Sequence, residues 1–180
     1  MTTTTSDQAT ARPATRTTQE APPMPADLDA VRKTITVAAP QATAFRVFAE
    51  EMRTWWPLAT HHIGKADARD VRLEPVVGGR CYEVGVDGTE HNWGHIRVWD
   101  PPSRLVFTWE ISPTWQVDPT IQSTVEVRFT SESPTRTRVD LTHGNLSTYG
   151  AQQAEMYKTY DSDNAWTGLL ELFARAAAGS

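Results

Sequence analysis

The strongest constraint on the fold is a regular alternation of apolar and polar residues in the middle of the chain. From Leu105 to Ile111 every second residue is large and apolar, and residues 125–129 and 138–142 alternate in the same way. Successive side chains of a strand point to opposite faces, so this alternation predicts antiparallel strands with one buried and one wet face. Further strands are predicted at residues 31–37, 71–77, 80–86 and 89–100, with Asp87-Gly88 as a hairpin turn.

Two segments follow a helical period instead. After Pro40, which suits the first turn of a helix, apolar residues at 44, 45, 48 and 52 predict a short helix that Pro57 ends. Residues 165–177 are also apolar at helical spacing, with Asp161 and Ser162 as candidate caps. Only this second helix is long enough to cover the inner face of the sheet. We therefore predict an α+β fold, a curved antiparallel sheet of about seven strands wrapped around a long C-terminal helix, with short helices after the first strand.

Composition argues against several functional classes. The 180 residues suffice for one domain, and the net charge of -5 argues against nucleic acid as a partner, since phosphate binding needs a basic face. No apolar run approaches the roughly 18 residues of a membrane span. The single cysteine, Cys81, fits a reducing cytoplasm. Residues 1–29 are rich in Thr, Ala, Pro and Gln, which predicts a disordered tail before a domain at 30–178.

Seven tryptophans are the most unusual feature of the composition. Tryptophan suits both a packed core and contact with a flat apolar molecule, and spacing alone does not choose between a dry core and a cavity. The walls of a cavity would combine indoles with a few polar or adaptable side chains. The candidate ligand-binding residues are Trp55, Trp56, His61, Tyr82, Trp93, His95, Trp109, Trp115, Tyr149, Met156, Tyr160 and Trp166.

Strand parity limits which residues of 89–100 can reach such a cavity. Trp93, His95 and Trp99 share one face of the predicted strand, and Ile96 and Val98 share the other. Only one of the two sets can point inward, and the sequence does not say which.

The histidines do not predict a metal site. His91 and His95 lie in one predicted strand, where four residues span roughly 13 Å, too far for a shared ion. His61 and His62 are adjacent in a loop, and no neighbouring Cys, Asp or Glu completes a ligand set. We expect no metal ion and no cofactor.

The sequence does not predict a catalytic centre either. There is no Gly-x-Ser-x-Gly turn, and Cys81 has no base near it in the sequence, so we expect it to be a small packed side chain. Four strand carboxylates could form an acid/base pair across the sheet, but they are more simply explained as solvated residues of the outer face. They are Glu83, Glu90, Glu110 and Asp140.

Several ordered blocks resemble a known superfamily. Gly94-His95-Ile96, Asp100-Pro101-Pro102 and residues 104–109 resemble the signature of the Bet v 1/START-like (SRPBCC) superfamily, in the branch named after the activator of Hsp90 ATPase. Residues 123–127 and 137–143 match further blocks, as does Ala165-Trp166, where the family usually has Gly-Trp. The resemblance covers residues 31–177 and implies the helix-grip fold with a hydrophobic cavity.

Within that branch the chain is also similar to enediyne self-resistance proteins of the calicheamicin type. Trp55-Trp56-Pro57, residues 91–94 and residues 109–119 carry this similarity. Such proteins bind a reactive polycyclic enediyne and lose an α-hydrogen from a glycine of their own backbone to its diradical. The corresponding loop here, residues 112–115, contains no glycine. The resemblance therefore supports ligand binding and argues against the sacrificial step.

Three functional hypotheses follow. The first is a non-catalytic module, a monomer or weak homodimer, that binds a small hydrophobic, aromatic or polycyclic ligand during biosynthesis of, or resistance to, a secondary metabolite. Tyr82, His95 and indole N–H groups would be its polar anchors. The second is a polyketide aromatase/cyclase, in which Tyr82 and His95 would supply acid and base. The third is a protein-binding module that associates with a chaperone, as the Hsp90-activator name implies.

Overall fold

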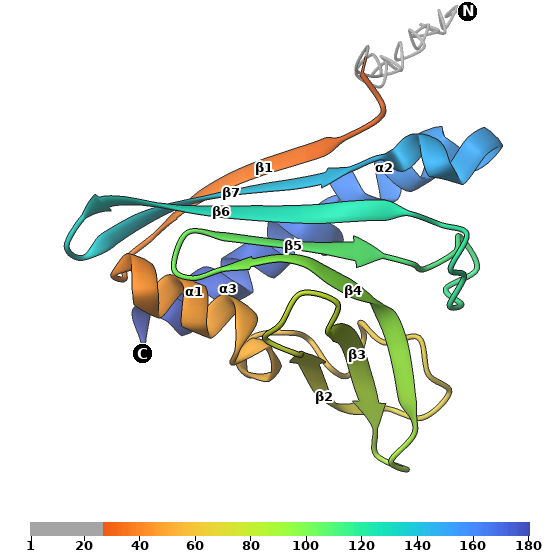
Figure 1. Cartoon of the computed structure of the whole chain (residues 1–180), viewed down its shortest axis with the longest axis horizontal. Coiled ribbons are helices and arrows are strands. Elements are labelled where there is room, and N and C mark those ends of the chain that lie inside the picture. The colour runs from red at the N-terminus through yellow and green to blue at the C-terminus, as the bar shows by residue number, and fades with distance from the viewer. Residues whose placement is uncertain (1–26) are drawn as a thin grey trace, which may run out of the picture.

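Figure 1 shows a computed structural model of the chain, which describes residues 27–180. The tail predicted over residues 1–29 lies outside the described residues, except for 27–29. Seven strands form one sheet in the order β1-β7-β6-β5-β4-β3-β2, and every neighbouring pair is antiparallel. The strands are β1 Val31–Val37, β2 Ala68–Leu73, β3 Arg80–Gly85, β4 Glu90–Asp100, β5 Arg104–Trp109, β6 Ser123–Ser133 and β7 Arg136–Gly144.

The alternating segment of the sequence forms β5 and the residues just after it. Leu105, Phe107, Trp109 and Ile111 are all buried, and Ile111 forms an isolated bridge to Val117. The hairpin predicted at Asp87-Gly88 is also confirmed, with a loop over residues 86–89 in which Gly88 has a φ of 85°. A positive φ is readily adopted by glycine, which explains its place in this turn.

Two element boundaries differ from the prediction. β2 covers 68–73 rather than 71–77, because Glu74 turns back and accepts a hydrogen bond from the backbone N–H of Arg80. Val76 and Val77 are consequently exposed in the turn. The first helix, α1 Gln41–Ala49, ends well before Pro57, and one 3-10 turn, Met52–Thr54, follows it.

The C-terminal helical segment is bent. A 3-10 segment, Leu146–Gln152, leads into α2 Gln153–Asp161, and a π-helical segment, Asp163–Thr167, leads into α3 Gly168–Ala178. Ser162 is extended and makes no side-chain capping bond, and Asp161 is the last residue of α2, so neither acts as the cap predicted for the final helix. The bend gives the segment two arms instead of one straight rod.

The core lies between the sheet and the helices. In Figure 1 α3 runs behind the sheet, and α1 lies beside it at the same end of the molecule. Phe48 of α1 packs against Phe173 of α3 and Phe129 of β6, with ring centroids 5.1 and 5.8 Å apart. Cys81 is buried in this core, as predicted. The predicted α+β helix-grip fold is confirmed. No helix in residues 27–180 is both long enough and apolar enough to cross a membrane.

Candidate functional site

A pocket of about 420 Å³ opens between the inner face of the sheet, the bend that joins α2 to α3, and the loop after the 3-10 turn. Its volume falls within the range of small-molecule sites. The lining residues are Trp56, Thr60, His61, His62, Ile63, Trp93, Trp109, Ile111, Trp115, Gln116, Thr159, Tyr160, Ser162, Asn164, Ala165, Trp166 and Leu169.

Four buried tryptophans from four separate segments of the chain form the wall of this pocket. Trp93 of β4 packs against Trp56 and Trp109, with ring centroids 5.1 and 5.4 Å away. Trp166, from the bend in the C-terminal helices, lies 6.0 Å from Trp109 and 6.4 Å from Trp56. The rings are tilted or edge-on to one another, which are the favoured arrangements of aromatic pairs. We refer to Trp56, Trp93, Trp109 and Trp166 as the tryptophan wall.

Hydrogen bonds fix the orientation of three of these indoles. The N–H of Trp56 donates to the carbonyl oxygen of His61 at 2.8 Å, and the N–H of Trp93 donates to the carboxylate of Glu83 at 3.0 Å. The N–H of Trp166 donates to Nδ1 of His143 at 3.0 Å. The indole nitrogen of Trp109 is buried without a hydrogen-bond partner among residues 27–180.

Glu83 connects the wall to the loop that borders the pocket. Besides Trp93, its carboxylate accepts the backbone N–H of Ile63 at 2.9 Å and of Gly64 at 2.6 Å. Glu83 is 1% exposed, so the prediction that it is a solvated outer-face residue is wrong. Its charge is compensated by the three N–H donors that surround it.

His143 supports the wall from behind. Its ring lies 4.2 Å from that of Tyr160 and is fully buried. An indole can only donate, so Nδ1 of His143 carries no proton and Nε2 carries the proton that it donates to Ser123 Oγ at 3.1 Å. Burial lowers the pKa of His143 to about 3, which keeps the ring neutral.

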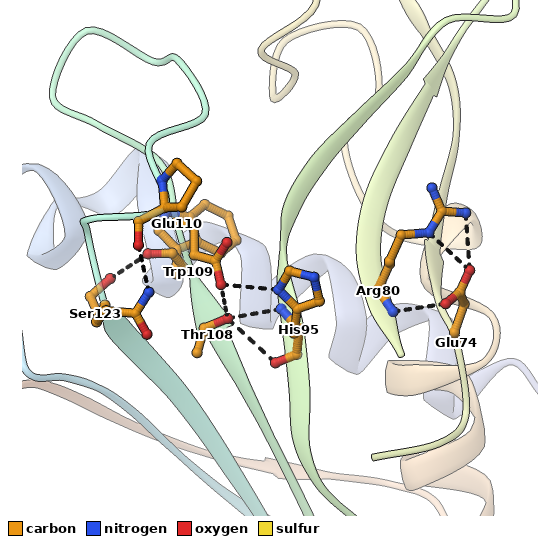
Figure 2. A network of polar contacts seen from close by, with 9 residues as sticks. Glu74, Arg80, His95, Thr108, Trp109, Glu110 and Ser123 are labelled. Atoms are coloured by element: carbon orange, nitrogen blue, oxygen red, sulfur yellow. Dashed lines mark hydrogen bonds and ion pairs between the residues drawn. The ribbon is translucent and has the colours of Figure 1, made fainter. Parts of the chain in front are cut away.

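A β-bulge overturns the parity prediction for β4. Thr108 and Trp109 are consecutive in β5 and so point to opposite faces. Figure 2 shows His95 bonded to Thr108 and Glu110. Trp93 instead packs on Trp109, so Trp93 and His95 lie on opposite faces of the sheet. Cys81 pairs with Gly94, but the next residue, Tyr82, pairs with Asn92. β4 therefore contains one extra residue at Trp93, and this bulge reverses the faces of the residues on either side of it.

Two of the predicted site residues, His95 and Tyr82, therefore lie on the outer face of the sheet, away from the pocket. His95 Nδ1 lies 3.1 Å from the carboxylate of Glu110, which also accepts the hydroxyl of Thr108 at 2.7 Å. Glu110 is 4% exposed, so it is not the solvated carboxylate that was predicted. Tyr82 is on the same side, with the Arg80 guanidinium 4.1 Å above its ring. Figure 2 shows Arg80 also held by Glu74 in this outer network.

The structure brings seven of the twelve predicted site residues to the pocket and places five elsewhere. Tyr82 and His95 lie on the outer face, Trp55 packs between Phe48 and Phe173, and Met156 is buried in the core. Tyr149 stands behind Tyr160, with their hydroxyl oxygens 2.8 Å apart. The seven that line the pocket are Trp56, His61, Trp93, Trp109, Trp115, Tyr160 and Trp166.

Sequence reasoning missed most of the polar lining of the pocket. His62 is not among the candidate ligand-binding residues, although its place directly after His61 in a loop was a usable signal. Nothing in the sequence pattern marked Gln116, Ser162 and Asn164, because they reach the pocket only through loop and helix-bend geometry. Residues 27–180 contain no cluster of three or more His, Cys, Asp or Glu side chains that could bind a metal ion.

The loop after β5 forms part of the pocket mouth. Trp115 lines the pocket and is 45% exposed. Its φ is 58°, a left-handed conformation that favours glycine over residues with a side chain. The backbone N–H of Ser112 donates to the carbonyl oxygen of Gln116, which closes the loop. A strained, half-exposed aromatic residue therefore stands at the entrance.

Comparison with protein families finds one matching family, described as Activator of Hsp90 ATPase homolog 1-like protein, over residues 38–178. No curated protein matches the chain.

Two solved structures combine substantial sequence identity with this fold. The anthrahydroquino-gamma-pyrone synthase Txn09, solved in complex with SUM, is 38% identical with a TM-score of 0.58, covering 84% of this chain and 99% of that one. The self-sacrificing resistance protein CalC from Micromonospora echinospora is 30% identical with a TM-score of 0.64, covering 85% of this chain and 97% of that one.

A third structure is similar in fold alone. It is PFC0360w, an HSP90 activator from Plasmodium falciparum, which is 18% identical with a TM-score of 0.53 and covers 80% of this chain and 94% of that one.

Proposed function

Because the chain belongs to the family of Activator of Hsp90 ATPase homolog 1-like proteins and has a pocket of about 420 Å³, we propose that it binds a small planar aromatic or polycyclic molecule in this pocket. The tryptophan wall is the observation that carries this proposal. Its indoles are desolvated and mostly held in place by hydrogen bonds, so a flat ring can pack against them without further ordering of the protein.

The two more similar relatives support a ligand of this class. The name of the synthase describes a fused aromatic product, and the name of CalC describes resistance. We therefore propose a role in the biosynthesis of, or self-resistance to, a polycyclic aromatic metabolite. The chain has no glycine at residues 112–115, so the proposed resistance would act by sequestering the compound rather than by sacrificing backbone.

Blocking the pocket tests this proposal. Thr159 lines it, and the neighbouring Lys158 is exposed on the same helix. In calorimetric titrations with anthracene, we expect Thr159→Trp to weaken binding at least tenfold and Lys158→Trp to leave it unchanged. Binding that is absent in the unmodified protein, or equally strong in both variants, would contradict the proposal.

A second candidate function is cyclisation of a polyketide-derived substrate in the same pocket. The 38% identity to a synthase and one histidine favour it. His62 Nδ1 lies 3.0 Å from the carbonyl oxygen of Gly64, which can only accept, so Nδ1 carries the proton and Nε2 is left as a base. His62 Nε2 has no hydrogen-bond partner among residues 27–180, whereas both nitrogens of His61 are engaged, by Thr60 and Asn164. A histidine with a free basic nitrogen can accept a proton from a substrate.

Substitution of His62 separates catalysis from binding. With a poly-β-ketone substrate, we expect His62→Gln to lower the rate of cyclisation by about 100-fold or more, because a general base contributes at least that much. His95→Gln, on the outer face, should keep the rate. Equal rates in the two variants, or no product from the unmodified protein, would exclude this second function. Chaperone binding stays a prediction from the family name, since the HSP90-activator relative shares the fold alone.

A further inference from the structure

Trp115 is the one tryptophan of residues 27–180 that pairs with no other aromatic ring. Each of the other six packs against at least one aromatic neighbour, and they are Trp55, Trp56, Trp93, Trp99, Trp109 and Trp166. Trp115 nevertheless lines the pocket, and it is 45% exposed. Single apolar residues are common on protein surfaces, but a large ring left open at the entrance of an aromatic pocket calls for an explanation.

The loop that carries Trp115 is closed at its base. Ile111 and Val117 form a bridge there, and the backbone N–H of Ser112 donates to the carbonyl oxygen of Gln116 at 2.8 Å. Between these anchors, the backbone N–H of Trp115 donates to the carbonyl oxygen of Ser112 at 2.9 Å. The left-handed φ of 58° at Trp115 is unfavourable for a residue with a Cβ, and such strain clusters at ligand clamps and active sites. The loop thus holds a tryptophan where a glycine would be less strained, which points to a role for the side chain.

A flat ligand on the tryptophan wall keeps one ring face uncovered unless another side chain lies over it. Tyr160 also lines the pocket, but its ring already packs on that of His143, with the centroids 4.2 Å apart. Trp115 is the other large aromatic side chain outside the wall that lines the pocket, and it has no such partner within residues 27–180. Burial of its exposed part and a new aromatic pair would both favour closure of the loop over a ligand.

We infer that Trp115 is a clamp, which closes over the outer face of the bound ring system and holds it between the loop of residues 112–116 and the tryptophan wall. Loop closure of this kind follows entry of the ligand and slows its release. The inference rests on the proposed aromatic binding and adds one requirement, namely that the ligand be flat on both faces. A folded ring system could rest on the wall with one part only and would leave the clamp without a full contact.

The release of anthracene tests the clamp separately from the pocket. Stopped-flow mixing of the complex with excess cyclodextrin, which traps the freed ligand, reports dissociation as a loss of energy transfer from tryptophan. We expect Trp115→Ala to speed release roughly tenfold, as the loss of one aromatic pair and its buried area implies, and to change the association rate much less.

Val117→Ala is the control for this measurement, since Val117 is 40% exposed in the same loop and does not line the pocket. It should leave the release of anthracene unchanged. An unchanged release rate in Trp115→Ala would overturn the clamp and leave aromatic binding intact. Failure of the unmodified protein to bind anthracene would instead sink the proposed function itself.

A folded ligand tests the requirement for two flat faces. 9,10-Dihydroanthracene has the carbon skeleton of anthracene, but its saturated middle ring tilts the two outer rings out of one plane. Trp115→Ala should speed its release by less than about threefold, because a folded molecule cannot pair fully with the wall and the clamp at once. Equal acceleration for both compounds would overturn the inference.

The solvent exposure of Trp115 gives a reading in the unmodified protein. A soluble nitroxide should broaden the NMR signals of the Trp115 indole, assigned from their loss in Trp115→Phe, because this side chain is half-exposed. Saturation with anthracene should restore most of their intensity as the clamp closes. Signals that stay broadened in the complex would overturn the inference even if Trp115→Ala folds poorly.

Discussion

The indole nitrogen of Trp166 donates to Nδ1 of His143 across 3.0 Å, and this bond ties the bend of the C-terminal helices to the middle of the sheet. His143 in turn donates to Ser123, whose hydroxyl donates to the carbonyl oxygen of Trp109 at 2.9 Å. Two members of the tryptophan wall are thus linked through one neutral, buried histidine. Protonation of that histidine would place a charge beside Tyr160 and convert Nδ1 from acceptor to donor.

Stability should therefore fall in mild acid. The pKa of His143 drops from 6.5 to about 3 on folding, so below pH 6.5 the unfolded chain binds a proton that the folded protein does not. The free energy of unfolding should then decrease by up to about 1.4 kcal/mol per pH unit, roughly 2 kcal/mol between pH 7.5 and pH 5. Urea unfolding at the two pH values measures this loss. His143→Gln should be less stable at pH 7.5, but its free energy of unfolding should change much less between the two pH values. An unchanged pH dependence in this variant would assign the effect to other groups.

Replacement of Gly94 should unfold the protein. A Cβ at this position would overlap the backbone carbonyl of Thr108 in the neighbouring strand, which cannot move without breaking the sheet. We expect Gly94→Ala to cost about 3 kcal/mol or more in the free energy of unfolding. Gly144 is also in a strand, but a Cβ added there would lie 3.8 Å from its nearest neighbours, so Gly144→Ala should be tolerated. Thermal melts of both variants decide the matter, and equal stabilities would refute this packing.

Substitution of Glu83 should loosen the edge of the pocket. A glutamine has the same shape but one acceptor oxygen instead of two, so it leaves at least one of the N–H groups of Ile63, Gly64 and Trp93 without a partner. We expect Glu83→Gln to lower the free energy of unfolding by about 2 kcal/mol and to speed amide hydrogen exchange at Ile63 and Gly64. Glu90→Gln, at an exposed ion pair with Arg80, should change stability by less than about 1 kcal/mol. If amide exchange at Ile63 and Gly64 were unchanged in Glu83→Gln, Glu83 would not be what holds this loop in place.

Trp115 should be better replaced by glycine than by alanine. Its left-handed backbone, with φ at 58°, is unfavourable for any residue that has a Cβ. We expect Trp115→Gly to be about 0.5–1 kcal/mol more stable than Trp115→Ala, after allowance for the greater freedom of glycine in the unfolded chain. Chemical denaturation of the pair measures the difference. If the alanine variant proved the more stable, the loop would not have the described conformation.

The elements that sequence reasoning predicted well are those set by local pattern. The bounds of β1, the buried set from Leu105 to Ile111 and the turn at Asp87-Gly88 all depend on near neighbours in the chain. The prediction that Trp93 and His95 share one face of β4 is wrong because one extra residue in the strand reverses the faces. Such a bulge has no reliable signal in a single sequence.

The polar groups of the site were harder to predict than its indoles. Glu83 looks like an ordinary strand carboxylate, and only the return of the 60–64 loop onto β3 buries it and supplies its donors. The break at Ser162 and Ala165 brings Asn164 to the pocket, where it faces side chains that are distant in the sequence. Long-range geometry of this kind is not encoded in residue spacing.

The most direct test of the central claim compares anthracene with perhydroanthracene, its fully saturated counterpart, in calorimetric titrations of the unmodified protein. Both compounds are apolar and of similar length, but only anthracene offers flat π faces to the tryptophan wall. Each aromatic pair contributes about 0.5–1.5 kcal/mol beyond buried area, so we predict that anthracene binds at least tenfold more tightly. Equal affinities, or tighter binding of the saturated compound, would show that the pocket does not select planar aromatic molecules.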